Sequence, residues 1–118
     1  MKTLIAKLSG SITIGSGDYQ LHKQIRSAME QGYDSAIFDM EEVNYMDSSA
    51  VGELVWCYKS ITEEGGQMAL ANLQPKVKEL LQILSFLDLF LVCDSVEDAL
   101  QIMRNRNQSA ERELVGAC

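Results

Sequence analysis

The chain has 118 residues, of which 47% are hydrophobic and 23% charged, and its formal net charge is −7 at pH 7. This length fits one domain that can bury a core without disulfides or a structural metal. The acidic balance argues against nucleic-acid binding, because phosphate contacts require clustered Lys and Arg. It is compatible with a basic protein partner.

No apolar run in the sequence is long enough to span a bilayer, and the first residues lack the apolar centre of a secretion signal. We therefore expect a cytoplasmic protein without a membrane span. Three cysteines, Cys57, Cys93 and Cys118, occur without CxxC spacing. An odd and scattered set favours reduced thiols, and the apolar surroundings of Cys57 and Cys93 indicate packing roles.

The first part of the sequence predicts a strand, a helix and a second strand. Residues 4–8 favour a strand that bends at Ser9-Gly10, and apolar residues at helical spacing between positions 21 and 29 predict a helix that ends at Gly32. The compact apolar residues 36–38 predict the second strand. We expect an acidic loop to follow over residues 39–47.

The next helix is predicted over residues 48–64 and is amphipathic. Its apolar stripe consists of Val51, Leu54, Val55, Tyr58 and Ile61. Gly65-Gly66 is expected to end this helix, because glycine tolerates the positive φ of a helix stop. Residues 68–71 predict another short strand.

The last part of the sequence predicts two more helices with a strand between them. Pro75 is expected in the first turn of a helix, where its missing N–H costs no hydrogen bond. Residues 89–92 predict a strand, and Ser95 followed by Asp98 resembles a capping box that opens the fourth helix. From residue 107 polar side chains interrupt the pattern, so we expect a domain over residues 1–106 and a flexible tail over residues 107–118.

Strands and helices therefore alternate along the chain. This order predicts an α/β domain with right-handed crossovers and a mostly parallel sheet with about four helices. In such folds the loops at the carboxyl ends of the strands carry function. The segment between residues 39 and 48 is therefore the first place to look for a site.

One motif in this segment combines a strand that ends in Asp39, an acidic stretch, and Asp47-Ser48-Ser49 at the start of a helix. It resembles the signature of STAS-domain anti-sigma factor antagonists. The glycine pair before the strand at residues 68–71, and residues 72–77 before the third helix, also match the spacing of that family. The resemblance covers residues 4–103.

The resemblance implies a STAS fold and a regulatory role without enzyme activity. In that family a histidine-kinase-like serine kinase doubles as the anti-sigma factor, and the unphosphorylated antagonist captures it and so releases the sigma factor. The implied phosphorylation site is Ser48. Phosphorylation dissociates the antagonist, and a separate phosphatase of the PP2C type resets it.

The residues that the resemblance assigns to partner binding surround this serine. They are Asp39, Asp47, Ser48, Ser49, Ala50 and Gly52. Other roles are open for most of them. Ser48 or Ser49 can cap the helix, Ser49 can be the modified residue, Asp47 can favour the helix dipole, and Asp39 can hydrogen-bond within its loop. Gly52 is expected to permit close packing of the helix.

Two features depart from the family pattern. Ala50 stands where the family usually has Gly, and its methyl group is expected to obstruct close approach by the kinase. The family also has a strand before the one predicted at residues 4–8, and no residues are available for it. We therefore expect an exposed sheet edge there, with either weak homo-oligomerisation or coverage of the edge by another segment.

Other functions receive less support from the sequence. His22 is expected to be a solvated surface residue, and no cluster suggests a nucleophile, a metal site or a cofactor site. A STAS-like accessory subunit of a lipid-transport ABC transporter is the main alternative, and a phosphorylation-independent ligand-sensing or scaffolding STAS module is another. The intact Asp47-Ser48-Ser49 favours the antagonist over the transporter subunit.

Overall fold

The computed structural model describes residues 1–12 and 18–116, in which four strands and four helices alternate strictly. The elements are β1 (Thr3–Ile12), α1 (Asp18–Glu30), β2 (Ser35–Met46), α2 (Ser48–Glu63), β3 (Met68–Ala71), α3 (Pro75–Ile83), β4 (Leu91–Cys93) and α4 (Val96–Gly116). The predicted alternation is therefore confirmed.

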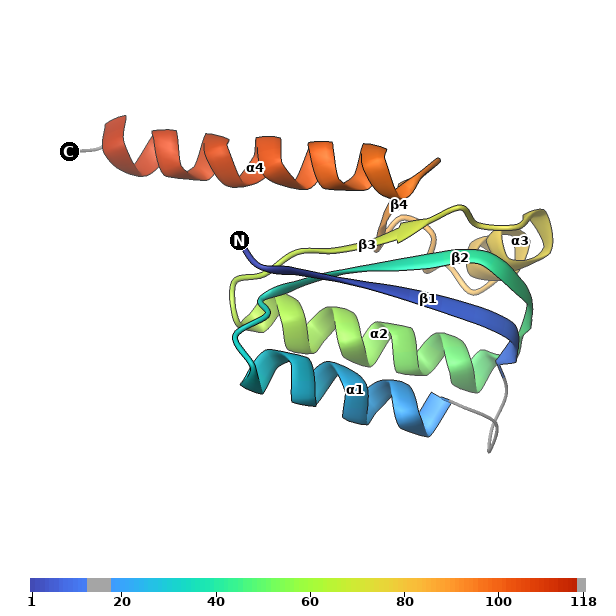
Figure 1. Ribbon diagram of the computed structural model, residues 1–118. Coiled ribbons are helices and arrows are strands. Elements are labelled where there is room, and N and C mark those ends of the chain that lie inside the picture. The colour runs from blue at the N-terminus through green and yellow to red at the C-terminus, as the bar shows by residue number, and fades with distance from the viewer. Residues whose placement is uncertain (13–17, 117–118) are drawn as a thin grey trace.

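The four strands form one sheet in the order β1-β2-β3-β4, and every neighbouring pair is parallel. Helices α1 and α2 lie side by side on one face of the sheet, and α4 lies on the opposite face (Figure 1). This three-layer arrangement confirms the predicted α/β class. β1 is the terminal strand at one end of the order, as expected for the strand predicted at residues 4–8.

The two faces of the sheet bury two separate apolar clusters. Phe38 and Leu70 pack with α1 and α2 on one face, while Ile37 and Ala69 pack with α4 on the other. All four side chains are fully buried. Central strands of a parallel sheet are covered on both faces, which is why residues 36–38 read as a continuous apolar run.

The acidic loop predicted over residues 39–47 is wrong, because β2 continues as a strand to Met46. Met40, Val43 and Met46 are buried at intervals of three residues. The pairing with β1 shifts register twice along this stretch, once between Lys7 and Ser9 and again between Gly10 and Ser11. Bulges of this kind break the alternation by which a strand is recognised in sequence.

The helix α2 begins and ends close to the predicted residues. Its last turn closes with a hydrogen bond of 3.0 Å from Gly65 N–H to Thr62 O and one of 2.9 Å from Gly66 N–H to Ile61 O. Gly65 has φ +85°, the left-handed conformation that this helix stop needs. The predicted stop at the glycine pair is confirmed.

The buried face of α2 differs in part from the predicted stripe. Val51, Leu54 and Ile61 are buried as expected, whereas Val55 and Tyr58 are only half-buried. The remaining core positions of this helix are Ala50 and Cys57.

Two boundaries in the C-terminal part of the chain, those of the last strand and the last helix, differ from the prediction. The last strand is Leu91–Cys93 instead of residues 89–92. The predicted cap of α4 is present, since Ser95 Oγ accepts a hydrogen bond of 3.0 Å from Asp98 N–H. The backbone then stays helical to Gly116, where polar residues had favoured a flexible tail from residue 107.

Candidate functional site

The N-terminus of α2 is built around Asp47. This residue is extended, with φ −95° and ψ 175°, and its Oδ1 accepts a hydrogen bond of 2.9 Å from Ala50 N–H. Its carbonyl oxygen accepts the first helical hydrogen bond, 3.2 Å long, from Val51 N–H. Asp47 is therefore the N-cap, and the expectation that Ser48 or Ser49 caps the helix is wrong.

Ser48 is consequently the first residue of the helix, and its side chain is exposed. Ser49 follows it and is half-buried. The first N–H groups of a helix have no partner within it, and those of Ser48 and Ser49 find none among the described residues. The positive end of the helix dipole and two free donors thus lie beside an exposed hydroxyl.

Ala50 lies on the opposite side of this first turn. Only 1% of its surface is exposed, so its methyl group is part of the core. The expectation that this methyl obstructs a partner at the surface is therefore wrong. The Ala50 side chain is not available for contact, so the predicted role of this residue in partner binding is left to its backbone.

Gly52 is exposed, and a Cβ built on it would meet no atom within 4 Å in the described structure. The prediction that it permits close helix packing is wrong. Residues four apart share one side of a helix, so Gly52 lies next to Ser48. Tyr45, at the end of β2, is 53% exposed and was not singled out from sequence. We call Tyr45, Ser48 and Gly52 the α2 N-terminal surface.

Asp39 has a structural role at some distance along β2. Its Oδ1 accepts hydrogen bonds of 3.1 Å from Glu41 N–H and of 3.1 Å from Asn72 Nδ2. Asp39 thereby joins β2 to the segment after β3, in agreement with the hydrogen-bonding role considered above. The remaining residues of β2 lie between Asp39 and Asp47 in the chain. The hydrogen bonds described for the two aspartates do not join them.

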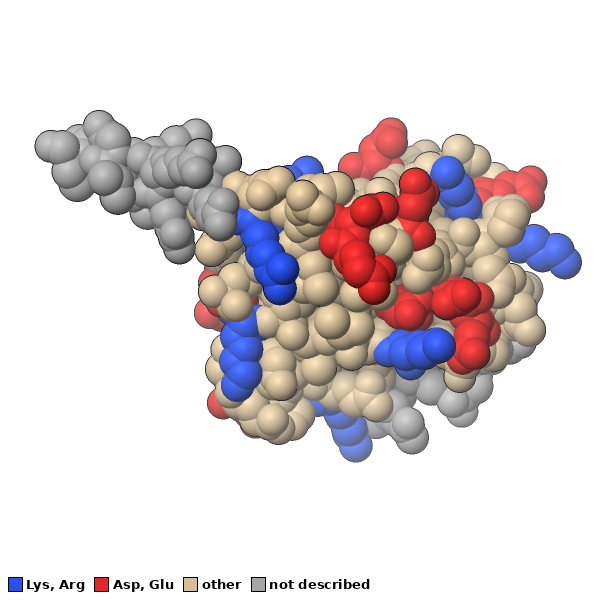
Figure 2. Space-filling model, turned by 45° about the horizontal axis from the view of Figure 1, so that its top comes forward, with Lys and Arg blue, Asp and Glu red and all other residues tan. Residues whose placement is uncertain are grey.

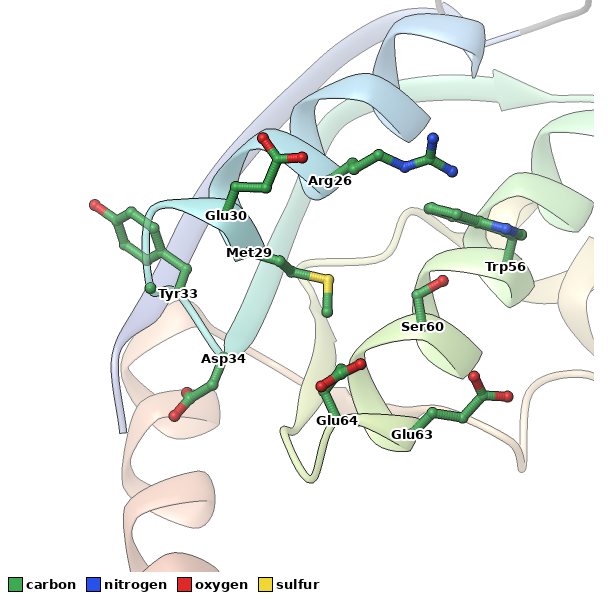
Figure 3. Close-up of a pocket in the computed structure, with 10 residues that line it drawn as sticks. Arg26, Met29, Glu30, Tyr33, Asp34, Trp56, Ser60, Glu63 and Glu64 are labelled. Carbon is green, nitrogen blue, oxygen red and sulfur yellow. The ribbon is translucent and has the colours of Figure 1, made fainter.

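A hollow of about 610 Å³ lies away from these residues, between the C-terminal halves of α1 and α2 (Figure 3). Met29 points into it, and the Arg26 guanidinium lies 5.7 Å from the centre of the Trp56 ring. Carboxylates, including Glu63 and Glu64, line its other side. None of the residues predicted to bind a partner lines this hollow.

The described residues contain no group of three His, Cys, Asp or Glu side chains that could hold a metal ion. Burial, with a smaller contribution from the Glu53 charge, raises the pKa of the Cys57 thiol to about 12. Burial also raises the pKa of Cys93. Both thiols are thus poor nucleophiles at neutral pH. The side chain of His22 lies outside the described residues, and no helix in the described part of the chain is long and apolar enough to cross a membrane.

The comparisons with known sequences and known structures agree on one protein family. The model of the STAS domain matches residues 2–99. The anti-sigma-B factor antagonist of Bacillus subtilis is 30% identical over 94 residues, which cover 80% of this chain and 84% of that protein. Among solved structures, the Bacillus cell fate determinant SpoIIAA in its phosphorylated form has a TM-score of 0.68 and 25% identity, covering 85% of this chain and 89% of that one. The STAS domain of a SulP transporter from Vibrio cholerae shares the fold, with a TM-score of 0.72, 16% identity, and coverage of 92% and 85%.

Proposed function

Because this chain belongs to the STAS domain family, we propose that it is an anti-sigma factor antagonist switched by phosphorylation of Ser48. In its unphosphorylated form it binds a histidine-kinase-like serine kinase that acts as the anti-sigma factor. Phosphorylation releases the kinase, and a PP2C-type phosphatase restores the binding form. The protein itself only binds and catalyses nothing.

The observation that carries this proposal is the position of Ser48. Asp47 holds the N-cap through its hydrogen bond to Ala50 N–H, so the neighbouring hydroxyl is not needed to cap the helix. The Ser48 side chain is exposed at the first helical residue and can enter the active site of another protein. A relative of known structure, SpoIIAA, has been solved in a phosphorylated form.

The α2 N-terminal surface supplies the contact area for the kinase. Tyr45 offers an exposed aromatic side chain, a residue type enriched at protein interfaces. Gly52 exposes bare backbone beside Ser48, so a partner can approach the helix closely at that point. The absence of a side chain at Gly52 suits a partner that must reach the Ser48 hydroxyl.

A phosphate on Ser48 is compatible with the folded helix. The free N–H groups of the first turn and the helix dipole favour negative charge at this position. The modification adds about −1.5 to −2 charges to a protein whose net charge is already −7. In a bound complex that charge must be desolvated against the partner, which is costly. Phosphorylation therefore weakens binding at the interface itself, and no refolding of the protein is required.

Incubation with the cognate serine kinase and ATP tests this proposal, with phosphate mapped by mass spectrometry. The wild type should take up one phosphate, Ser48→Ala none, and the matched control Ser49→Ala one. Transfer of the phosphate to Ser49, or no transfer at all, would contradict the assignment. A STAS module that works without phosphorylation, such as an ABC transporter subunit, predicts the latter outcome.

A further inference from the structure

The outer edge of β1 is open. This strand is terminal in the sheet, and among the described residues it pairs only with β2. Gly10 has φ +78°, outside the extended region, so residues 3–9 are the stretch of this edge that precedes that interruption. The N–H and C=O groups that face outward there are available to another strand.

Hollows flank this edge on both faces of the sheet. On the side of α1, a hollow of about 530 Å³ is lined by Leu4, Ala6 and residues of the helix that include Ala28. On the side of α4, a hollow of about 380 Å³ is lined by Ile5, Leu100 and their neighbours.

The side chains at the second hollow are unusually exposed for their type. Ile5 is 49% exposed, and Met1, which lines the same hollow, is 44% exposed. A strand added to β1 would send alternate side chains to the two faces, and therefore into both hollows. An unpaired edge, room on each face and exposed apolar side chains thus occur together.

We propose that the occupant of this edge is β1 of a second copy of the chain, paired antiparallel about a two-fold axis at Ala6. The axis stands perpendicular to the sheet, so each residue pairs with one on the same face. Centring on Ala6 pairs every residue from 3 to 9. The cross-strand pairs are then Ala6 with Ala6, Ile5 with Lys7, Leu4 with Leu8, and Thr3 with Ser9.

This register suits the side chains that meet in it. Leu4 meets Leu8 on the α1 side, where Leu4, Ala6 and Ala28 supply the apolar part of the hollow. Lys7 is the only charged residue within residues 3–9, and it meets the exposed Ile5 of the second copy and not its own equivalent. Centring on Lys7 would instead bring two like charges face to face, which destabilises a sheet.

The net charge of the protein should make the stability of this dimer depend on ionic strength. Each copy carries a net charge of −7, so the two copies repel each other at low ionic strength. Figure 2 shows one face on which acidic side chains gather to one side of a broad area without charged residues. Salt should therefore strengthen the dimer by screening this repulsion. The dimer does not depend on the phosphorylation of Ser48 proposed above.

Sedimentation velocity from about 5 µM to about 500 µM tests the proposal, because mass action must shift a weak dimer over that range. Two variants of one exposed residue test the register. Ile5→Glu places a carboxylate opposite Lys7 and should retain the dimer, whereas Ile5→Lys places a like charge there. The dimer of Ile5→Lys should be weaker than that of Ile5→Glu by about tenfold in dissociation constant.

Disulfide trapping gives a second readout in a Cys118→Ser background. Opposite residues of an antiparallel pair lie about 4.5–5.5 Å apart between Cα atoms, within the range of a disulfide. Oxidation of Ala6→Cys should therefore give covalent dimers, while Glu79→Cys, at an exposed position of α3 that lines neither hollow, should not. A wild-type monomer across the whole concentration range would overturn the proposal. Equal dimerisation of the two Ile5 variants would overturn the register and with it the assigned edge.

Discussion

The Oδ1 atom of Asp47 accepts a hydrogen bond of 2.9 Å from the backbone N–H of Ala50, and this contact sets the first turn of α2. It makes Asp47 the cap, leaves Ser48 exposed, and turns the Ala50 side chain into the core. A capping aspartate that is removed usually lowers helix stability by about 1 kcal/mol.

We therefore expect Asp47→Ala to lower the free energy of unfolding by about 1 kcal/mol, while Asp47→Asn, which can still cap, changes it by less. Urea unfolding followed by circular dichroism measures both. Equal stability of Asp47→Ala and the wild type would show that the cap contributes nothing.

Gly52→Ala separates stability from function at the α2 N-terminal surface. The position is helical and exposed, and a methyl group there meets open space. Alanine should therefore raise the free energy of unfolding, by up to about 1 kcal/mol, because glycine is a poor helix former. The same methyl group should weaken kinase binding by obstructing close approach. Isothermal titration calorimetry and urea unfolding report the two effects, and a stabilised variant with unchanged affinity would remove Gly52 from the contact surface.

Variants of Asn72 test how backbone conformation and a side-chain hydrogen bond stabilise the segment after β3. It has φ +58°, and its Nδ2 donates a hydrogen bond of 3.1 Å to Asp39. Asn72→Gly loses the hydrogen bond but accepts the backbone conformation, whereas Asn72→Ala loses the hydrogen bond and is also strained. We expect Asn72→Ala to be the less stable variant by about 1 kcal/mol in urea unfolding. The opposite ranking would mean that backbone strain does not govern this position.

Cys57 should make the stability depend on pH in the alkaline range. Burial raises the pKa of its thiol from 9.0 to about 12 in the folded chain. Between these values the unfolded thiol ionises and the folded one does not, so the unfolded state binds fewer protons and stability falls as pH rises. The loss approaches about 1.4 kcal/mol per pH unit and is absent well below pH 9.

Urea unfolding of the wild type and of Cys57→Ala over this pH range checks the prediction. The variant lacks the thiol, so its free energy of unfolding should fall less steeply between pH 9 and pH 12, even though its stability at neutral pH is lower. Parallel pH profiles of the two proteins would contradict the assigned role of the thiol.

Most of the fold could be predicted because local pattern and tertiary structure agree. The glycine pair after α2 and Pro75 at the start of α3 mark helix ends through backbone constraints that act locally. The second half of β2 could not be predicted, since its buried residues Met40, Val43 and Met46 are spaced by bulges against β1. That spacing depends on a partner strand far away in the sequence.

The candidate site could be predicted only in part, because some of its features also depend on tertiary structure. The motif located Ser48 at a helix start, but only the structure shows that Asp47 takes the cap. Whether a helical residue faces the core depends on how the helix sits on the sheet, which decides that Ala50 is buried and Gly52 is exposed. Tyr45 gave no clear signal, because its exposure follows from the bulged path of β2.

We expect negative charge at Ser48 to dissociate the kinase, and the affinity of the kinase for charge variants of Ser48 measures this effect. Ser48→Ala should bind as the wild type does, because it removes only a small polar group. Ser48→Asp should bind about thirtyfold more weakly, equivalent to about 2 kcal/mol, since its charge must be desolvated in the interface. Ser27→Asp adds the same charge at an exposed position of α1 and should leave the affinity unchanged. Binding of Ser48→Asp as tight as that of the wild type would contradict the account.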